Sequence, residues 1–153
     1  MPVQSTYSET IRPGVVGHIY DMVPKALISR NVEDVAGIGF GKVVQIGARD
    51  EGCTADLNTT AMTAQRFLGI TARERSLVAE ADKFAQYESA RIVRKGGVWV
   101  AVAVAVAPSD IVTVTLATGV IGKTAVDAGV VAIPNAKWES TTAGAGIAKL
   151  RLD

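Results

Sequence analysis

Valine occupies every second position from Val98 to Val106, with alanine or tryptophan at the positions between. Successive side chains of a strand point to opposite faces, so this alternation predicts a β-strand with one valine face and one face that is nearly all alanine. We expect the valine face to pack into a core and the alanine face to admit a second layer at close range. An apolar strand without charge or proline would promote aggregation at a sheet edge, so we place it in the middle of a sheet.

Turn residues flank this strand on both sides. Lys95-Gly96-Gly97 predicts a turn after an earlier strand over 87–94, and Pro108-Ser109-Asp110 predicts a hairpin to a strand over 111–116. Three antiparallel strands would then follow one another directly. Apolar or alternating runs predict further strands over 15–20, 38–46, 66–70, 130–133, 137–141 and 147–152.

Many short strands separated by turn signals predict an all-β fold, an antiparallel β-sandwich or barrel with the jelly roll as one form. Helix is expected only as a turn or two within 24–36 and 73–84, where apolar residues have helix-like spacing. Residues 1–13 are polar and predict an extended N-terminal arm. The remaining residues, 14–153, suit a single β-domain with one core. A polar stretch over 49–62 predicts a long loop.

The charge balance excludes several classes of protein. The chain has 16 Lys and Arg against 15 Asp and Glu, a net charge of +1, whereas a protein held to DNA by phosphate contacts needs a clear basic excess. The N-terminus lacks the basic start and apolar segment of a secretory signal, and no apolar stretch reaches the roughly 20 residues of a membrane-spanning helix. We therefore expect a protein made in the cytoplasm, with no nucleic-acid or membrane partner.

A catalytic or zinc site would have to be built on His18, Asp21 and Cys53. His18 is the single histidine and Cys53 the single cysteine, so the chain lacks both a tetrahedral set of Cys and His ligands and an internal disulfide. Asp21 lies three residues after His18, on the opposite face of the expected strand. No local signature of a nucleophile and its base is present, and we expect neither enzyme activity nor a bound metal.

Two other patterns fit structural roles better than ligand sites. Asp50, Glu51 and Asp56 are carboxylates that a hard cation could use, but their spacing does not match the EF-hand loop. The segment Gly37-Ile38-Gly39-Phe40-Gly41-Lys42 lacks the spacing and the Gly-Lys-Ser/Thr ending of a phosphate-binding loop. Its glycines instead predict a bulge or a tight crossing within a strand, and we predict no cofactor.

Several segments, taken in order, resemble the cement or decoration proteins of tailed double-stranded DNA phage capsids. They are Gly17-His18-Ile19-Tyr20-Asp21, Ile38-Gly39-Phe40-Gly41-Lys42-Val43-Val44 with the trailing Gly47, Phe67-Leu68-Gly69-Ile70-Thr71, Gly97-Val98-Trp99-Val100, and Ala136 to Gly144 running into Ile147 to Leu152. Together these segments cover most of the chain from residue 14 onward. The family pattern is weak around 49–62 and 76–87.

The resemblance implies a non-enzymatic structural protein of the virion, without a cofactor, that is made in the cytoplasm of the bacterial host. Such a protein would sit on the outer surface of the head, clamp neighbouring subunits of the major capsid protein and so stabilise the shell. It would also associate with itself, and capsid symmetry favours a homodimer or a homotrimer.

We expect the capsid interface to involve the arm from Pro2 to Arg12 and the loop from Asp50 to Thr60, because both are polar and lie outside the apolar strands. The individual candidates are Pro2, Gln4, Tyr7, Arg12, Asp50 and Asn58. Arm contacts with an adjacent subunit would use main-chain hydrogen bonds, as in β-strand addition.

Two other functions remain open on the sequence alone. One is a small β-barrel accessory module that binds carbohydrate or another ligand, which a concave pocket lined by aromatic rings would favour. The other is an enzyme, which would require His18, Asp21 or Cys53 to converge in one cleft.

Overall fold

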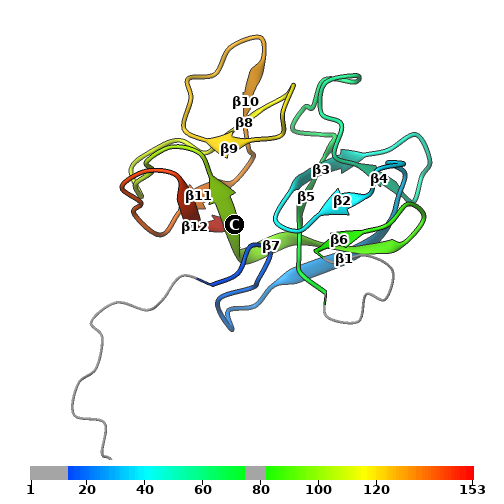
Figure 1. Cartoon of the computed structure of the whole chain (residues 1–153), viewed down its shortest axis with the longest axis horizontal. Coiled ribbons are helices and arrows are strands. Elements are labelled where there is room, and N and C mark those ends of the chain that lie inside the picture. Colours follow the sequence, from blue (N-terminus) through cyan, green and yellow to red (C-terminus); the bar gives the residue numbers. More distant parts are fainter. Residues whose placement is uncertain (1–13, 75–81) are drawn as a thin grey trace, which may run out of the picture.

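The computed structural model describes residues 14–74 and 82–153, and all regular secondary structure in that part is β-strand, as predicted. The described chain forms two lobes joined by β7 (Figure 1). The predicted arm over 1–13 lies outside the described residues. The strands are β1 (Ala26–Val32), β2 (Ile38–Gly39), β3 (Val43–Ile46), β4 (Gly52–Thr54), β5 (Phe67–Thr71), β6 (Lys83–Phe84), β7 (Ser89–Val102), β8 (Thr113–Thr115), β9 (Ile121–Gly122), β10 (Val130–Ala132), β11 (Ala136–Trp138) and β12 (Gly146–Leu152).

Both lobes are built on β7. The first half of this strand, residues 89–95, pairs antiparallel with β1 and, over a shorter stretch, with β5. The second half pairs antiparallel with β12 from Gly96 to Val102 and parallel with β9 at Val102. The first part of the valine-alanine stretch, from Val98 to Val102, therefore lies inside a sheet, as predicted.

The turn predicted at Lys95-Gly96-Gly97 is wrong, because β7 runs straight through it for 14 residues. Gly96 has a φ of +120°, and the opposite strand β1 has a register shift at the same place, between Ala26 and Leu27. A Cβ on Gly97 would lie 2.3 Å from the Tyr20 ring. The two glycines let the strand change neighbours and pass beneath Tyr20 without reversing direction.

The first lobe contains a closed five-stranded barrel in the order β1-β4-β3-β5-β7, which closes because β1 pairs with both β4 and β7. The barrel is mixed, since β1 and β4 run parallel whereas all other neighbouring strands of the barrel run antiparallel. The short ladder of β2 and β6 adds aromatic packing, with the rings of Phe40 and Phe84 5.1 Å apart. One buried cluster lies wholly within this lobe and consists of Val32, Ile38, Phe40, Val44, Cys53, Leu68, Phe84, Ala90 and Ile92.

The second lobe extends β7 with β12 and β11 on one side and with β9, β8 and β10 on the other. The hairpin predicted between β7 and 111–116 is wrong, because β8 pairs with β9 and β10 instead. β12 has seven residues in register with β7, which set Leu150 opposite Val98 and Ala148 opposite Val100. Since β8 has only three residues, pairing with β12 gives a longer part of the valine-rich stretch of β7 a hydrogen-bonded neighbour.

Neither segment with helix-like spacing contains a helix in its described part. Segment 24–36 forms β1, because the ladder to β7 and the burial of Ile28 and Val32 outweigh the weak intrinsic stability of a short helix. Of segment 73–84, residues 75–81 lie outside the described residues and Lys83–Phe84 forms β6.

Tight turns shorten two of the predicted strands, and a short strand interrupts the predicted loop. Over 15–20 only an isolated bridge joins Ile19 to Val98, because the chain turns at Gly17, whose φ is +83°. Over 38–46 a turn at Gly41 (φ +65°) separates β2 from β3. A Cβ on Gly41 would lie 2.5 Å from Cγ1 of Val16, which confirms the tight crossing expected of these glycines. β4 lies within the loop predicted over 49–62.

Gly69→Ala should destabilise the barrel by about 2–4 kcal/mol, because Gly69 has a φ of +147° and a Cβ there would lie 2.1 Å from the Val93 carbonyl oxygen. Gly146→Ala is the matched control, since that glycine lies in β12 with nothing within 4 Å of an added Cβ. Thermal unfolding of both variants measures the effect. Equal melting temperatures would contradict the close approach of β5 and β7.

Candidate functional site

Four of the predicted interface residues, Pro2, Gln4, Tyr7 and Arg12, lie outside the described residues. The other two, Asp50 and Asn58, are exposed in separate loops. Asp50 lies in the turn before β4, and Asn58 lies in the loop after it. The structure therefore leaves both accessible, and their role in an interface stays a prediction.

The loop after β4 is held from inside the barrel. Nε2 of the buried Gln45 donates to the backbone oxygens of Asp56 (2.7 Å) and Thr60 (2.8 Å). The Thr59 hydroxyl, together with the N–H groups of Thr59 and Asn58, donates to the Asp56 carboxylate and holds its pKa below the usual value. Residues 56–60 therefore present a fixed polar surface.

His18, Asp21 and Cys53 do not form a catalytic site. Cys53 is fully buried in the barrel, where desolvation, followed by the charges of Asp34 and Glu33, raises the pKa of its thiol to about 12. A thiol with this pKa stays protonated at neutral pH and is a poor nucleophile. His18 is exposed, and within the described residues no group of His, Cys, Asp and Glu side chains is placed to hold a metal ion.

Tyr87 lies exposed at one end of the barrel and is not among the predicted interface residues. Tyr87 is 63% exposed although its φ is +66°, a conformation that bulky residues rarely adopt. Its N–H donates to the Val32 carbonyl (2.8 Å), and Arg49 stacks on its ring at 5.7 Å. The two residues border a hollow of about 330 Å³ that is also lined by Asp50.

The exposure of Tyr87 indicates a contact surface. Strained backbone persists only where the surrounding structure enforces it, and it concentrates at binding and catalytic positions. Tyr and Arg are also the residue types enriched at the energetic centres of protein interfaces. Val35, in a neighbouring turn, is 84% exposed and adds apolar surface. The sequence signal that could have identified Tyr87 is a lone aromatic residue in a polar turn.

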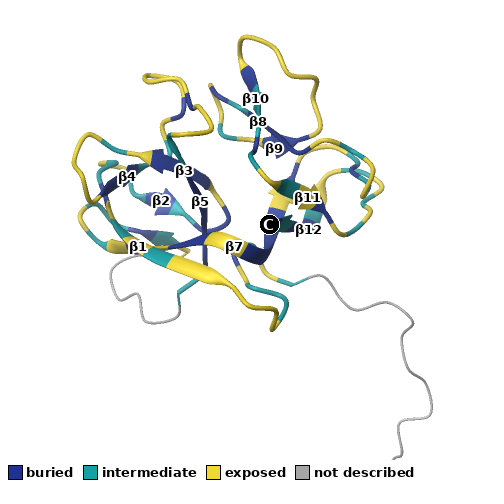
Figure 2. Ribbon diagram, turned by 180° about the vertical axis from the view of Figure 1, so that it is seen from behind, coloured by how far each residue is buried: buried dark blue, intermediate teal, exposed yellow. Residues whose placement is uncertain are grey.

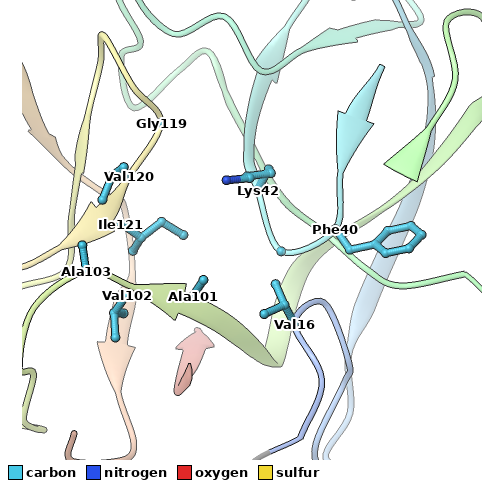
Figure 3. Close-up of a pocket in the computed structure, with 10 residues that line it drawn as sticks. Val16, Phe40, Lys42, Ala101, Val102, Ala103, Gly119, Val120 and Ile121 are labelled. Carbon is cyan, nitrogen blue, oxygen red and sulfur yellow. The ribbon is translucent and has the colours of Figure 1, made fainter. Parts of the chain in front are cut away.

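A second candidate surface is a groove between the lobes, with a volume of about 190 Å³ (Figure 3). Ala101 and Ala103 of the predicted alanine face lie on one side, Val120 on another and Val16 on a third. Both alanines are exposed, so the close second layer expected on that face is wrong for the described part of the chain. Strand β7 ends at Val102, and Val104 is 42% exposed beyond it. The groove is mainly apolar, with Lys42 as its charged lining residue.

A third cluster fixes the segment that leads from residue 14 into β1. A Cβ on Gly14 would lie 2.3 Å from Nε1 of Trp99, so this glycine packs directly on the indole of β7. Farther along, Tyr20 donates its hydroxyl to Glu139 (2.5 Å). Arg151 of β12 pairs with both Glu139 (2.5 Å) and Asp21 (2.7 Å). The start of the described chain is thereby tied to the C-terminal hairpin.

Burial, hydrogen bonds and charges in this third cluster shift the pKa values of Tyr20 and Glu139. Burial, followed by the hydrogen bond to Glu139 and its charge, raises the pKa of Tyr20 well above its ordinary value. Partial desolvation would raise the pKa of Glu139, but hydrogen bonds from Tyr20 and Arg151 outweigh it and hold that pKa below its ordinary value. The cluster therefore favours ionised Glu139 and neutral Tyr20.

These features define an all-β protein with exposed apolar and aromatic surfaces and a buried thiol. No helix among residues 14–74 and 82–153 has the length and apolarity needed to cross a bilayer. The candidate contact surfaces are an aromatic corner, an apolar groove and fixed polar loops.

The sequence matches the family model described as "Structural cement protein (E217 gp24/Pam3 gp6)" over residues 3–153. The chain therefore belongs to the structural cement protein family of phage capsids, a family of non-enzymatic virion components. This finding confirms the resemblance seen in the sequence.

The fold is also similar to a chain of a solved structure described as "The capsid of Myoviridae Phage XM1". The two chains superpose with a TM-score of 0.73 at 17% sequence identity, over 100% of this chain and 98% of that chain. At this identity the likeness shows a shared fold. None of the curated proteins matches the sequence.

Glu139→Gln should reduce the pH dependence of stability in acid. A carboxylate whose pKa is lower in the folded than in the unfolded chain stabilises the fold above its unfolded pKa, near 4.3 in model peptides, and loses this effect as pH falls through the folded value. Melting temperatures of both proteins between pH 7 and pH 3, taken as a difference at each pH, measure it. The difference should shrink on acidification, and a constant difference would contradict the assigned hydrogen bonds.

Proposed function

We propose that this cement protein binds the outer surface of expanded phage heads and clamps neighbouring subunits of the major capsid protein. The observation that carries the proposal is the single strand β7, which takes part in the ladders of both lobes. A clamp needs two contact surfaces held at a fixed separation. A continuous hydrogen-bonded strand that runs through two lobes with a shared buried cluster provides that rigidity.

Each lobe offers apolar side chains that a shell surface could cover. On the first lobe these are Tyr87 and Val35; on the second, Ile111 is 51% and Val126 is 55% exposed. We include the arm over 1–13 and the loop over 50–60 as further contacts, since Asp50 borders the same hollow as Tyr87. The net charge of +1 favours contacts made by apolar packing and hydrogen bonds over long-range attraction.

The ligand-binding alternative gains no support from the described surfaces. Among the described residues that line the groove, Phe40 is the only aromatic one, and it is 5% exposed, so these residues provide no ring platform of the kind that carbohydrate recognition would favour. Tyr87 is the only aromatic residue among those of 14–74 and 82–153 that line the hollow at the barrel end. We therefore propose one function.

The proposed function is tested by co-sedimentation of the purified protein with heads that lack it, over a concentration series and with unexpanded shells as the control. A ligand that binds only the assembled shell stabilises it by its binding free energy, so binding should saturate at a fixed ratio to the major capsid protein and should prefer expanded heads. Absence of binding by folded protein would contradict the proposal.

Tyr87→Asn should weaken binding to heads by about tenfold or more, because it removes a central aromatic side chain from the contact. The same change should leave the melting temperature unchanged or raise it, since Asn tolerates the φ of +66° better than Tyr does. Thr141→Ala, at an exposed position of the second lobe, is the control. Loss of stability together with binding would show that Tyr87 serves the fold rather than the contact.

A further inference from the structure

The strand β1 has an open edge over residues 26–30. One edge of β1 pairs with β7 along residues 26–31, whereas its other edge pairs with β4 only at Asn31 and Val32. Among the described strands, none pairs with that second edge over 26–30. β1 is also exposed over much of its length (Figure 2).

The hydrogen-bonding direction of β1 identifies the groups on this open edge. Asn31 donates its N–H to Glu51 on the β4 side (2.8 Å), and Val32 donates to Glu88 on the β7 side (3.0 Å). Because directions alternate along a strand, Leu27 and Ser29 point their main-chain groups to the same side as Asn31. Within the described residues, one of these groups has an assigned partner: the Ser29 carbonyl, which accepts from Nη1 of Arg30 (2.9 Å).

Apolar side chains lie beside this edge. Leu27 is 38% exposed on the outward face of β1, and the preceding loop carries Met22 and Val23, which are 97% and 42% exposed. An open, partly apolar edge is a template for pairing with another strand, and stable proteins cover or block such edges. A single added strand would satisfy the free main-chain groups and place its side chains beside Leu27.

Residues 1–13 have the composition of such a strand. Val3, Tyr7 and Ile11 fall on one face of an extended chain, with Ser, Thr and Gln filling half of the other positions. Thirteen extended residues reach at most about 43 Å at ~3.3 Å each, far enough to leave one copy and pair with another. These residues carry one acidic side chain, Glu9, and one basic side chain, Arg12, so charge does not oppose their approach to the edge.

We propose that the arm of one copy adds as a strand to the open edge of β1 in a neighbouring copy. The open edge faces away from β7, whereas the described chain begins at Gly14, which packs on Trp99 of β7. The described chain thus begins beside the half of β7 that pairs with β12, whereas the open edge belongs to the strand that pairs with the other half. The inference rests on the proposed function, because the shell brings copies side by side, and it names the contact that links them.

The test uses full-length protein with a photo-crosslinking amino acid in place of Tyr7, mixed with an equal amount of isotopically heavy protein and bound to heads. Cross-linked peptides are then identified by mass spectrometry. The proposal predicts cross-links from position 7 to the peptide that contains Leu27 and Ser29, joining light to heavy copies. Cross-links confined to one copy, or cross-links that reach only the major capsid protein or only the groove at Ala103, would overturn it.

Ser29→Pro and Ser29→Ala provide the matched pair of variants. Proline removes an N–H from the open edge without removing a bond of the ladder to β7, so the cross-link should be lost while the fold persists. Alanine keeps the N–H and should keep the cross-link. Leu27→Glu places a charge beside the incoming strand without altering the backbone. This variant should also lose the cross-link. Persistence of the cross-link in both Ser29→Pro and Leu27→Glu would refute the proposal.

Co-sedimentation of each variant separates this inference from the proposed function. If the wild-type protein fails to bind heads, the cement function itself is contradicted. If it binds heads without a cross-link between the arm and β1 of another copy, the strand-addition inference is wrong and the cement function stands.

Discussion

The pairing of β7 with strands of both lobes is the interaction on which the rest of the structure depends. Its first half closes the barrel, and its second half carries Val98 and Val100, both fully buried. Burial of one valine stabilises a fold by roughly 1.5–3 kcal/mol, so several on one strand account for much of the core. One buried cluster includes Val43 and Ile70 of the barrel as well as Leu150 of the second lobe. The lobes therefore share a core as well as a strand.

The sequence predicted the parts of the fold that depend on local pattern. Strict alternation identified the last part of β7, and β5, β10 and β12 fall close to their expected ranges. It could not predict pairing between distant segments. The turn residues at Gly96 and Gly97 indicate a reversal locally, but the ladder to β12, about 50 residues later, keeps the strand continuous through them. Short segments such as β1 lack enough periodicity to separate strand from helix, and their partners decide.

The candidate surfaces also divide into features that follow from local sequence pattern and features that depend on contacts between distant segments. Polarity identified Asp50 and Asn58 as exposed, which they are, but polarity cannot show that Tyr87 is held in a left-handed conformation beside Arg49. That conformation depends on hydrogen bonds to β1, which no local pattern reveals. The alanine face shows the reverse case. Its small side chains were expected to lie beneath a second layer, and they instead line an open groove.

We propose that the protein holds two contacts at a fixed separation and so stabilises the shell, beyond simply binding to it. This clamp is tested by the temperature at which heads release their DNA, measured for heads that lack the protein and for the same heads saturated with it. Saturation should raise this temperature. Saturated binding with an unchanged release temperature would contradict the clamp.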